Sequence, residues 1–111
     1  MKIAVIDGQG GGIGKLITEK IRKALPQAEI IALGTNALAT SLMLKSGAND
    51  GASGENAIAI NVGSVDVIVG SLSILIANSM LGEFTPGMAA AVANSSAKKL
   101  VIPLTRSNVE V

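Results

Sequence analysis

The sequence predicts a small α/β domain with a doubly wound, mostly parallel, four-stranded sheet in a three-layer arrangement. Three observations support this fold class. Short apolar runs alternate with segments of helical periodicity, which is typical of parallel sheets with helical crossovers. A glycine cluster separates the first apolar run from the first helical segment. The 111 residues are 49% hydrophobic and 15% charged, so the chain has the size of one domain and too little charge for disorder.

The first 34 residues predict a βαβ unit. Residues 3–6 are an apolar run typical of a strand buried on both faces. Residues 14–25 have apolar side chains at helical spacing, and Pro26 ends this helix. Residues 29–33 form the second strand, which ends at a glycine.

The middle of the chain predicts two further helices around a loop. Thr35 or Asn36 can cap a helix that reaches residue 46. Residues 47–54 are polar and glycine-rich, and we expect a loop there. Residues 54–62 are interpreted as a helix, although residues 57–62 also fit a strand that turns through a Gly-Ser hairpin.

The second half predicts two more strands. Residues 65–69 form the third strand, and residues 72–81 are expected to be a short buried helix. Thr85 followed by proline starts an alanine-rich helix to residue 94. Residues 100–102 form the fourth strand. The whole chain, residues 1–111, therefore reads as a single Rossmann-like domain.

The composition excludes several classes of chemistry. Histidine, cysteine, tryptophan and tyrosine are absent, which removes the usual neutral-pH proton shuttle, thiol nucleophiles, disulfides and Cys/His metal sites. A net charge of +1 and one aromatic residue, Phe84, give little support for nucleic-acid binding. The longest uncharged stretch, residues 67–82, is short and interrupted for a membrane helix, and the first apolar run is too short for a secretory signal. We expect a cytoplasmic protein.

The most informative segment is the glycine loop between the first strand and the first helix. It predicts an anion site, because unpaired N–H groups and the positive end of the helix dipole point into such a loop. Phosphate is the natural ligand. The alternative is that the glycines only permit tight packing of strand and helix. The segment reads Asp7, Gly8, Gln9, Gly10, Gly11, Gly12, Ile13, Gly14, Lys15.

Known glycine motifs match this loop only in part. The dinucleotide fingerprint fails, because Gly8-x-Gly10 is followed by Ile13 where its third glycine belongs. The phosphate loop of NTPases fails, because Leu16 replaces its hydroxyl residue. The spacing of Gly8, Gly12 and Gly14 resembles the cofactor loop of short-chain dehydrogenases. That family reduces carbonyls with a tyrosine and a lysine, so without tyrosine the resemblance implies binding rather than that reaction. The cofactor stays unknown, with a nucleotide or dinucleotide phosphate as the candidate.

Other loops at the carboxyl ends of the strands are expected to meet the glycine loop. Thr35 and Asn36 stand where an acidic residue usually holds the adenosine ribose, so specificity for NAD is not supported. Gly70 and Ser71 follow the third strand. Arg106, after the fourth, can grip a phosphate with two parallel hydrogen bonds. Each of these residues could equally cap a helix.

Acidic side chains leave further alternatives open. Asp7 could bind a metal, accept a sugar hydroxyl or cap the glycine loop, and Asp66 is expected to be structural. A binding module for a phosphate-bearing ligand is the favoured function. The alternative is an enzyme that uses Asp7, Lys15 and Arg106 on a small phosphorylated or carboxylated substrate. A structural homo-oligomer without a ligand is the third.

Charge is sparse in the middle of the chain. Residues 30–97 contain only five charged side chains, and a domain of this size cannot cover such apolar helices alone. We expect a homo-oligomer, at least a dimer, that buries the helices between residues 35 and 94. The five charged residues are Lys45, Asp50, Glu55, Asp66 and Glu83.

Taken whole, the chain resembles a small bacterial family of uncharacterised proteins of about this length. The resemblance begins with residues 6–15, Ile-Asp-Gly-Gln-Gly-Gly-Gly-Ile-Gly-Lys, and continues through residues 32–40, 54–58, 66–70 and 102–104. It implies a complete protein of this family and no particular activity.

Overall fold

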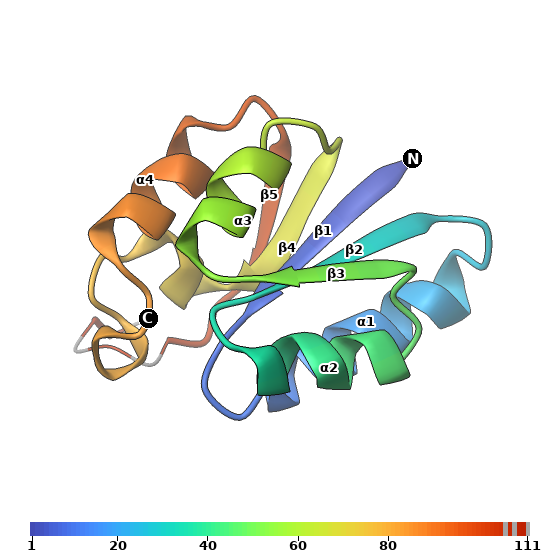
Figure 1. Ribbon diagram of the computed structural model, residues 1–111, viewed down its shortest axis with the longest axis horizontal. Helices are drawn as coiled ribbons and strands as arrows, with labels where there is room; N and C mark the ends of the chain where they lie inside the picture. Colours follow the sequence, from blue (N-terminus) through green and yellow to red (C-terminus); the bar gives the residue numbers. More distant parts are fainter. Residues whose placement is uncertain (106, 108, 111) are drawn as a thin grey trace.

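Five parallel strands form one sheet, which lies between two pairs of helices (Figure 1). The computed structural model describes residues 1–105, 107 and 109–110. The strand order is β3-β2-β1-β4-β5, and every neighbouring pair is parallel. The strands are β1 (Lys2–Asp7), β2 (Glu29–Gly34), β3 (Asp50–Ser53), β4 (Val67–Ser71) and β5 (Lys98–Ile102). The helices are α1 (Gly12–Ala24), α2 (Ala37–Lys45), α3 (Glu55–Asn61) and α4 (Pro86–Asn94).

Each face of the sheet has its own apolar core. The pair α1 and α2 covers one face, and the pair α3 and α4 covers the other (Figure 1). Alternate strand residues supply the two cores, as expected for strands buried on both faces. The first core contains Ile3, Val5, Ile17, Ala28, Ile30, Ala32 and Met43. The second includes Ala4, Ile6, Leu33, Ile58, Ile68, Ile74, Phe84 and Val92.

The helices predicted from capping signals are confirmed. Asn36 caps α2, since its Oδ1 accepts a hydrogen bond from the Ala39 N–H at 2.9 Å. Thr85 caps α4 in the same way, accepting from the Met88 N–H at 3.1 Å. The helical interpretation of residues 54–62 is confirmed by α3, so the strand alternative was wrong.

Two segments differ from the prediction. The expected loop at residues 47–54 contains β3, a short strand that pairs only with β2 and has no buried residue. An edge strand with so little burial needs no apolar alternation, so its sequence looks like a loop. The expected helix at 72–81 is instead two 3₁₀ turns, η1 (Leu72–Leu75) and η2 (Met80–Gly82).

The strand order places a switch point between β1 and β4. The chain winds from β1 through β2 to β3 with α1 and α2 on one face, and then crosses from β3 to β4 and on to β5 with α3 and α4 on the other. The loops that leave the carboxyl ends of β1 and β4 therefore diverge, which opens a crevice where sheets of this kind bind ligands. Within the part of the chain that the structure describes, no helix is long and apolar enough to span a lipid bilayer.

Candidate functional site

The glycine loop lies at this switch point, and the surroundings of its glycines divide them into two groups. A Cβ atom at Gly8 would lie 2.5 Å from the Thr35 Oγ1, and one at Gly14 would lie 2.7 Å from the Asp7 Cβ. Gly11 has a φ of 76°, and its Cβ would lie 2.8 Å from the Ala39 Cα. These three are glycine for packing or backbone reasons. At Gly10 and Gly12 a Cβ would meet no atom of the described residues within 4 Å.

Some N–H groups of the loop are satisfied within the protein. The Gly11 N–H donates to the Gly8 carbonyl at 3.0 Å, and the Gly14 N–H donates to the Asp7 Oδ2 at 2.6 Å. The N–H groups of Gly10, Gly12 and Ile13 have no hydrogen-bond partner among the described residues. They lie in the loop and first turn of α1, where the helix dipole adds positive potential.

Asp7 connects the two ends of the glycine loop by a hydrogen bond. Its side chain is 1% exposed and accepts the Gly14 hydrogen bond, which ties the end of β1 to the first turns of α1. This hydrogen bond is the one expected of a carboxylate that caps the glycine loop, which is one of the roles considered for Asp7. Within the described residues, no group of three or more acidic, histidine or cysteine side chains could hold a metal.

Glu83 is a residue of this site that the sequence analysis did not identify as functional. It follows η2, and its Oε1 accepts from the Gln9 N–H at 2.8 Å and the Asn36 Nδ2 at 2.5 Å. The Thr35 hydroxyl donates to the same oxygen. One carboxylate therefore joins the loops after β1 and β2. An available signal was its isolation as one of few charges in an apolar stretch.

An unusual backbone presents Glu83 to the loop. Asn78, Met80 and Leu81 all have φ between 57° and 64°. This is the left-handed region of backbone conformation, which residues other than glycine adopt uncommonly. A short bridge between Ser79 and Phe84 closes this turn, and the Phe84 ring is fully buried. Such local strain persists only where the surroundings enforce it, and it is concentrated at functional sites.

Thr35 and Asn36 lie where the sequence placed them, but both are engaged with the protein. Asn36 caps α2 with its oxygen and uses its Nδ2 on Glu83 and on the Gln9 carbonyl, the latter at 3.0 Å. Thr35 donates to Glu83. The hydrogen bonds of Thr35 and Asn36 hold the loop after β2 against Glu83, and Asn36 also holds it against the glycine loop.

Ser71 is the most unusual polar group near the loop. Its side chain is 2% exposed, and its Oγ has no hydrogen-bond partner among the described residues. A Cβ at Gly70 would face Ile74 in the core under α4, so the next side chain, that of Ser71, faces the α1 side. A buried unsatisfied hydroxyl costs about 1–3 kcal/mol, and a ligand that bonded to it would remove this cost.

The remaining predicted residues are Gly70, Lys15 and Arg106. Gly70 packs against Ile74 and the Ile6 carbonyl rather than facing the loop. Lys15 is exposed on α1, whereas Asp7 is buried. Arg106 lies outside the described residues. The chain just before it reaches the end of β4, where the Ser73 hydroxyl donates to the Thr105 Oγ1 at 3.3 Å.

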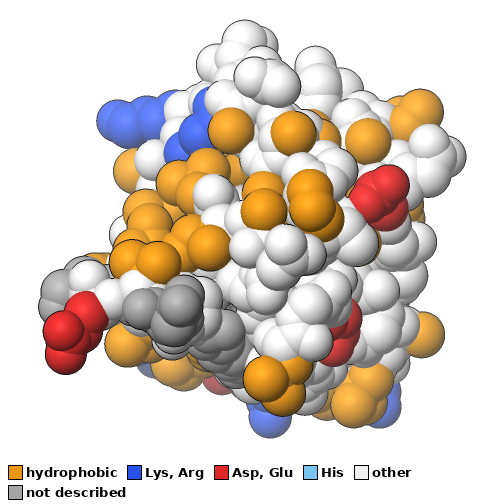
Figure 2. Space-filling model, turned by 90° about the vertical axis from the view of Figure 1, so that its left-hand side faces the viewer, with side chains coloured by type: hydrophobic (Ala, Val, Ile, Leu, Met, Phe, Trp, Pro, Cys, Tyr) orange, Lys and Arg blue, Asp and Glu red, His pale blue; other side chains and the backbone are white. Residues whose placement is uncertain are grey.

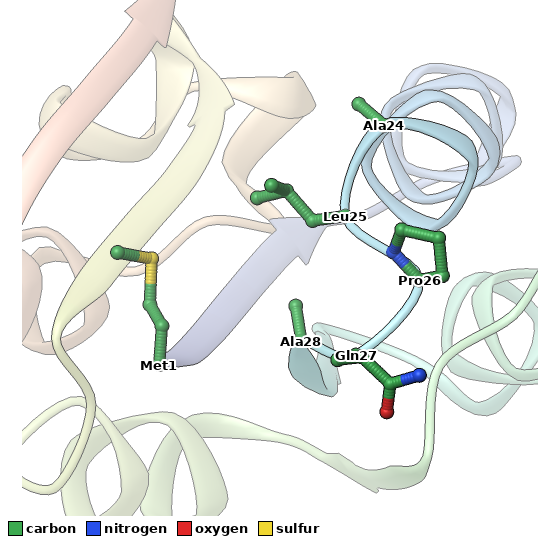
Figure 3. A pocket seen from close by; sticks show the side chains of 6 residues that line it. All are labelled: Met1, Ala24, Leu25, Pro26, Gln27 and Ala28. Carbon is green, nitrogen blue, oxygen red and sulfur yellow. The ribbon is translucent and has the colours of Figure 1, made fainter.

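A separate hollow lies at the amino ends of the strands, opposite the end that carries the glycine loop. It has a volume of about 340 Å³ and lies beside the end of α1 and the start of β1. Figure 3 shows Leu25 and Met1 flanking it, with the Gln27 amide turned away. No predicted site residue lines this hollow, so it is not part of the candidate site. Its lining residues are Met1, Ala24, Leu25, Pro26, Gln27 and Ala28.

Comparison with models of protein families places the chain in a family. The model of a protein family described as a domain of unknown function, DUF3842, matches residues 2–111. No curated protein and no solved structure matches the chain.

Proposed function

Since the chain belongs to the DUF3842 family, a domain of unknown function, we propose its function from the site itself: it binds a phosphate-bearing small molecule at the glycine loop. The anion is held by backbone N–H groups at the amino end of α1. The proposal concerns binding and assigns no reaction.

The contrast among the loop glycines is the observation that carries this proposal. Gly8, Gly11 and Gly14 are required by packing or by backbone conformation, whereas Gly10 and Gly12 have open space where a side chain would be. Contacts with the described residues give no reason for glycine at these two positions. Close approach of a ligand to the backbone is such a reason.

The unpaired groups around that space support an anion in particular. The N–H groups of Gly10, Gly12 and Ile13 lack protein partners among the described residues, and phosphate oxygens are strong acceptors. The Ser71 hydroxyl, also without a described partner, can donate one more hydrogen bond from the same face of the sheet.

The turn that carries Glu83 favours a compact phosphate over an extended dinucleotide. The space above Gly8, which a dinucleotide crosses in related folds, is filled by the Thr35 hydroxyl, the Met80 sulfur and the Glu83 carboxylate. Negative charge at that point would also repel a second phosphate. The ligand therefore approaches the loop on the side of Gly10 and Gly12.

Calorimetry with inorganic phosphate, adenosine monophosphate and adenosine tests the proposal. Gly12→Asp should eliminate phosphate binding, because the side chain blocks the N–H groups, and its carboxylate offsets the positive end of the helix dipole and repels the anion. Gly12→Ala should weaken binding less.

The matched control is Gly63→Asp, the same change at an exposed glycine beyond the end of α3 with no close neighbour except the Ile60 carbonyl at 3.5 Å. It should bind like the unchanged protein. Equal affinity for adenosine and its monophosphate, or full phosphate affinity in Gly12→Asp, would mean that the loop is not an anion site.

We further propose that the protein acts in the cytoplasm as a homo-oligomer. The helices α2 and α3 expose Leu38, Leu44 and Ile60, and few charges surround them. Figure 2 shows another face of the molecule on which hydrophobic side chains gather and charged ones are few. Apolar surface of this kind favours self-association.

A further inference from the structure

An apolar groove begins directly at the amino end of α1. It has a volume of about 270 Å³, slightly below the range of about 300–1,000 Å³ usual for ligand pockets. It runs between α1 and the end of β5, because no described helix follows β5 to cover this face of the sheet. The groove is lined by Gly12, Ile13, Leu16, Ile17, Lys20, Ile102 and Leu104.

The groove and the proposed anion site share residues. Gly12 and Ile13 contribute to the site N–H groups that have no partner among residues 1–105, 107 and 109–110, and both residues also line the groove. Ser71, whose hydroxyl is buried without a described partner, pairs in register with Ile102, a wall of the groove. Paired residues on neighbouring strands face the same side of a sheet. The buried hydroxyl therefore lies on the same face of the sheet as the groove.

The walls of the groove indicate what it can hold. Apart from Gly12 and the Lys20 side chain, the lining is aliphatic. The single aromatic residue, Phe84, is buried in the core on the other face of the sheet. Among the described residues of the lining, a nucleobase would find no stacking partner and no amide or hydroxyl side chain for its polar edge. The cost of desolvating that edge would therefore not be compensated. A hydrocarbon chain has no such cost.

We propose that the ligand is an amphiphile, a phosphate monoester of a linear aliphatic chain, with the phosphate at the N–H groups of the loop and the chain in the groove. This inference rests on the proposed function and specifies its ligand class. Lys20 stands at the rim, where its charge attracts an anionic ligand and its methylene stem covers apolar surface. The ligand is a free small molecule, because the groove is short and continuous with the loop.

Calorimetry with inorganic phosphate and with butyl, hexyl and octyl phosphate, each below its micelle concentration, tests the inference. Affinity should rise with chain length by up to about fourfold for each fully buried methylene, which corresponds to ~0.8 kcal/mol. Octanol should bind far more weakly than octyl phosphate. Adenosine monophosphate should bind no more tightly than butyl phosphate.

A variant of the groove separates its contribution from that of the loop. Leu16 is 53% exposed in the groove wall, so Leu16→Ser should leave the fold intact. We expect octyl phosphate to bind about tenfold more weakly and inorganic phosphate to bind unchanged. Leu25→Ser is the matched control, because Leu25 is 47% exposed just beyond α1 but lies outside the groove.

The outcomes distinguish this inference from the function on which it rests. If phosphate binds and Gly12→Asp prevents it, but chain length has no effect, the amphiphile is wrong and the anion site stands. If octyl phosphate binds equally to Gly12→Asp, both are wrong, as they are if none of the phosphates binds.

Two further results would assign the groove to another occupant and overturn the inference. The first is binding to vesicles that contain phosphatidic acid without binding to soluble alkyl phosphates. The second is a Leu16→Ser variant that binds octyl phosphate normally but changes from dimer to monomer in light scattering.

Discussion

Within the β1–α1 loop, each glycine can be tested by adding one methyl group. At Gly14 the added Cβ would lie 2.7 Å from both the Asp7 Cβ and the Met43 Sδ, so Gly14→Ala should destabilise the fold by about 1–3 kcal/mol through overpacking. At Gly12 it would meet none of the atoms that the structure describes within 4 Å, and alanine is about 1 kcal/mol better than glycine in a helix. Gly12→Ala should therefore be neutral or stabilising in urea unfolding.

The same comparison checks the assignment of the two glycine groups. A loss of stability in Gly12→Ala similar to that in Gly14→Ala would show that Gly12 also has a packing role. Gly10→Ala provides a second instance, because that position is equally open.

Removing the charge of Glu83 should change stability and anion affinity in opposite directions. The Oε1 of Glu83 accepts from Gln9, Thr35 and Asn36, and hydrogen bonds to charged groups are stronger than neutral ones. Glu83→Gln should lower the free energy of unfolding by about 1–2 kcal/mol. It should raise phosphate affinity by roughly fivefold, since a nearby negative charge costs an anion about 1 kcal/mol.

Glu55→Gln is the control for that experiment. Glu55 also accepts a hydrogen bond from a threonine, Thr85, but it does so at the start of α3. Its replacement should leave phosphate affinity unchanged, and an equal gain in both variants would indicate only an effect of net charge.

At the scale of single residues, the sequence identified the glycine loop but not Glu83, which binds to it. Gly10, Gly12 and Ser71 were candidates because the end of a strand and the start of a helix are local features. Glu83 was not, because its hydrogen bonds join it to residues 47 to 74 positions away. A sequence pattern gives no sign of such contacts, and the left-handed turn that directs Glu83 contains residues that do not usually adopt that conformation.

At the scale of elements, α2 depends on one residue that has two functions. Asn36 caps the helix through its oxygen and binds the Glu83 carboxylate through its nitrogen. Asn36→Asp keeps a good cap but places two carboxylates together, whereas Asn36→Ser keeps a cap without the charge. We expect the aspartate variant to be the less stable by about 1–3 kcal/mol in chemical denaturation. Equal stability would show that Glu83 does not matter to α2.

An element could be predicted when the interactions that form it join residues close together in the sequence. Helices α2 and α4 were predicted because their caps act within three residues. Strand β3 was missed because it depends on pairing with β2, with no apolar pattern of its own. The segment 72–81 was predicted as a helix because of its apolar composition, whereas the short bridge between Ser79 and Phe84 and the left-handed residues of the turn break it into 3₁₀ turns.

At the scale of the molecule, self-association is the main prediction. We expect at least a dimer at tens of micromolar in light scattering. Leu38→Glu on α2 or Ile60→Glu on α3 should shift it toward monomer, because these side chains are 58% and 66% exposed and a charge is costly to bury in an apolar contact.

Leu25→Glu is the control for these two variants, because Leu25 lies outside the charge-poor helices. It should leave the assembly intact. A monomer mass for the unchanged protein would contradict the prediction. Dissociation by Leu25→Glu alone would place the contact at the hollow near Met1.

The central position of β1 affects the protein while it is being synthesised. Residues 2–7 are made before the other strands of this sheet, yet one side of β1 stays open until residues 67–71 are made to pair with it. About 60 residues of translation, at roughly 5–20 residues per second, take several seconds. During that time a strand of strongly apolar sequence presents unpaired N–H and C=O groups on the nascent chain. Strand β1 is therefore the segment that a chaperone would have to cover until the second half of the protein has left the ribosome.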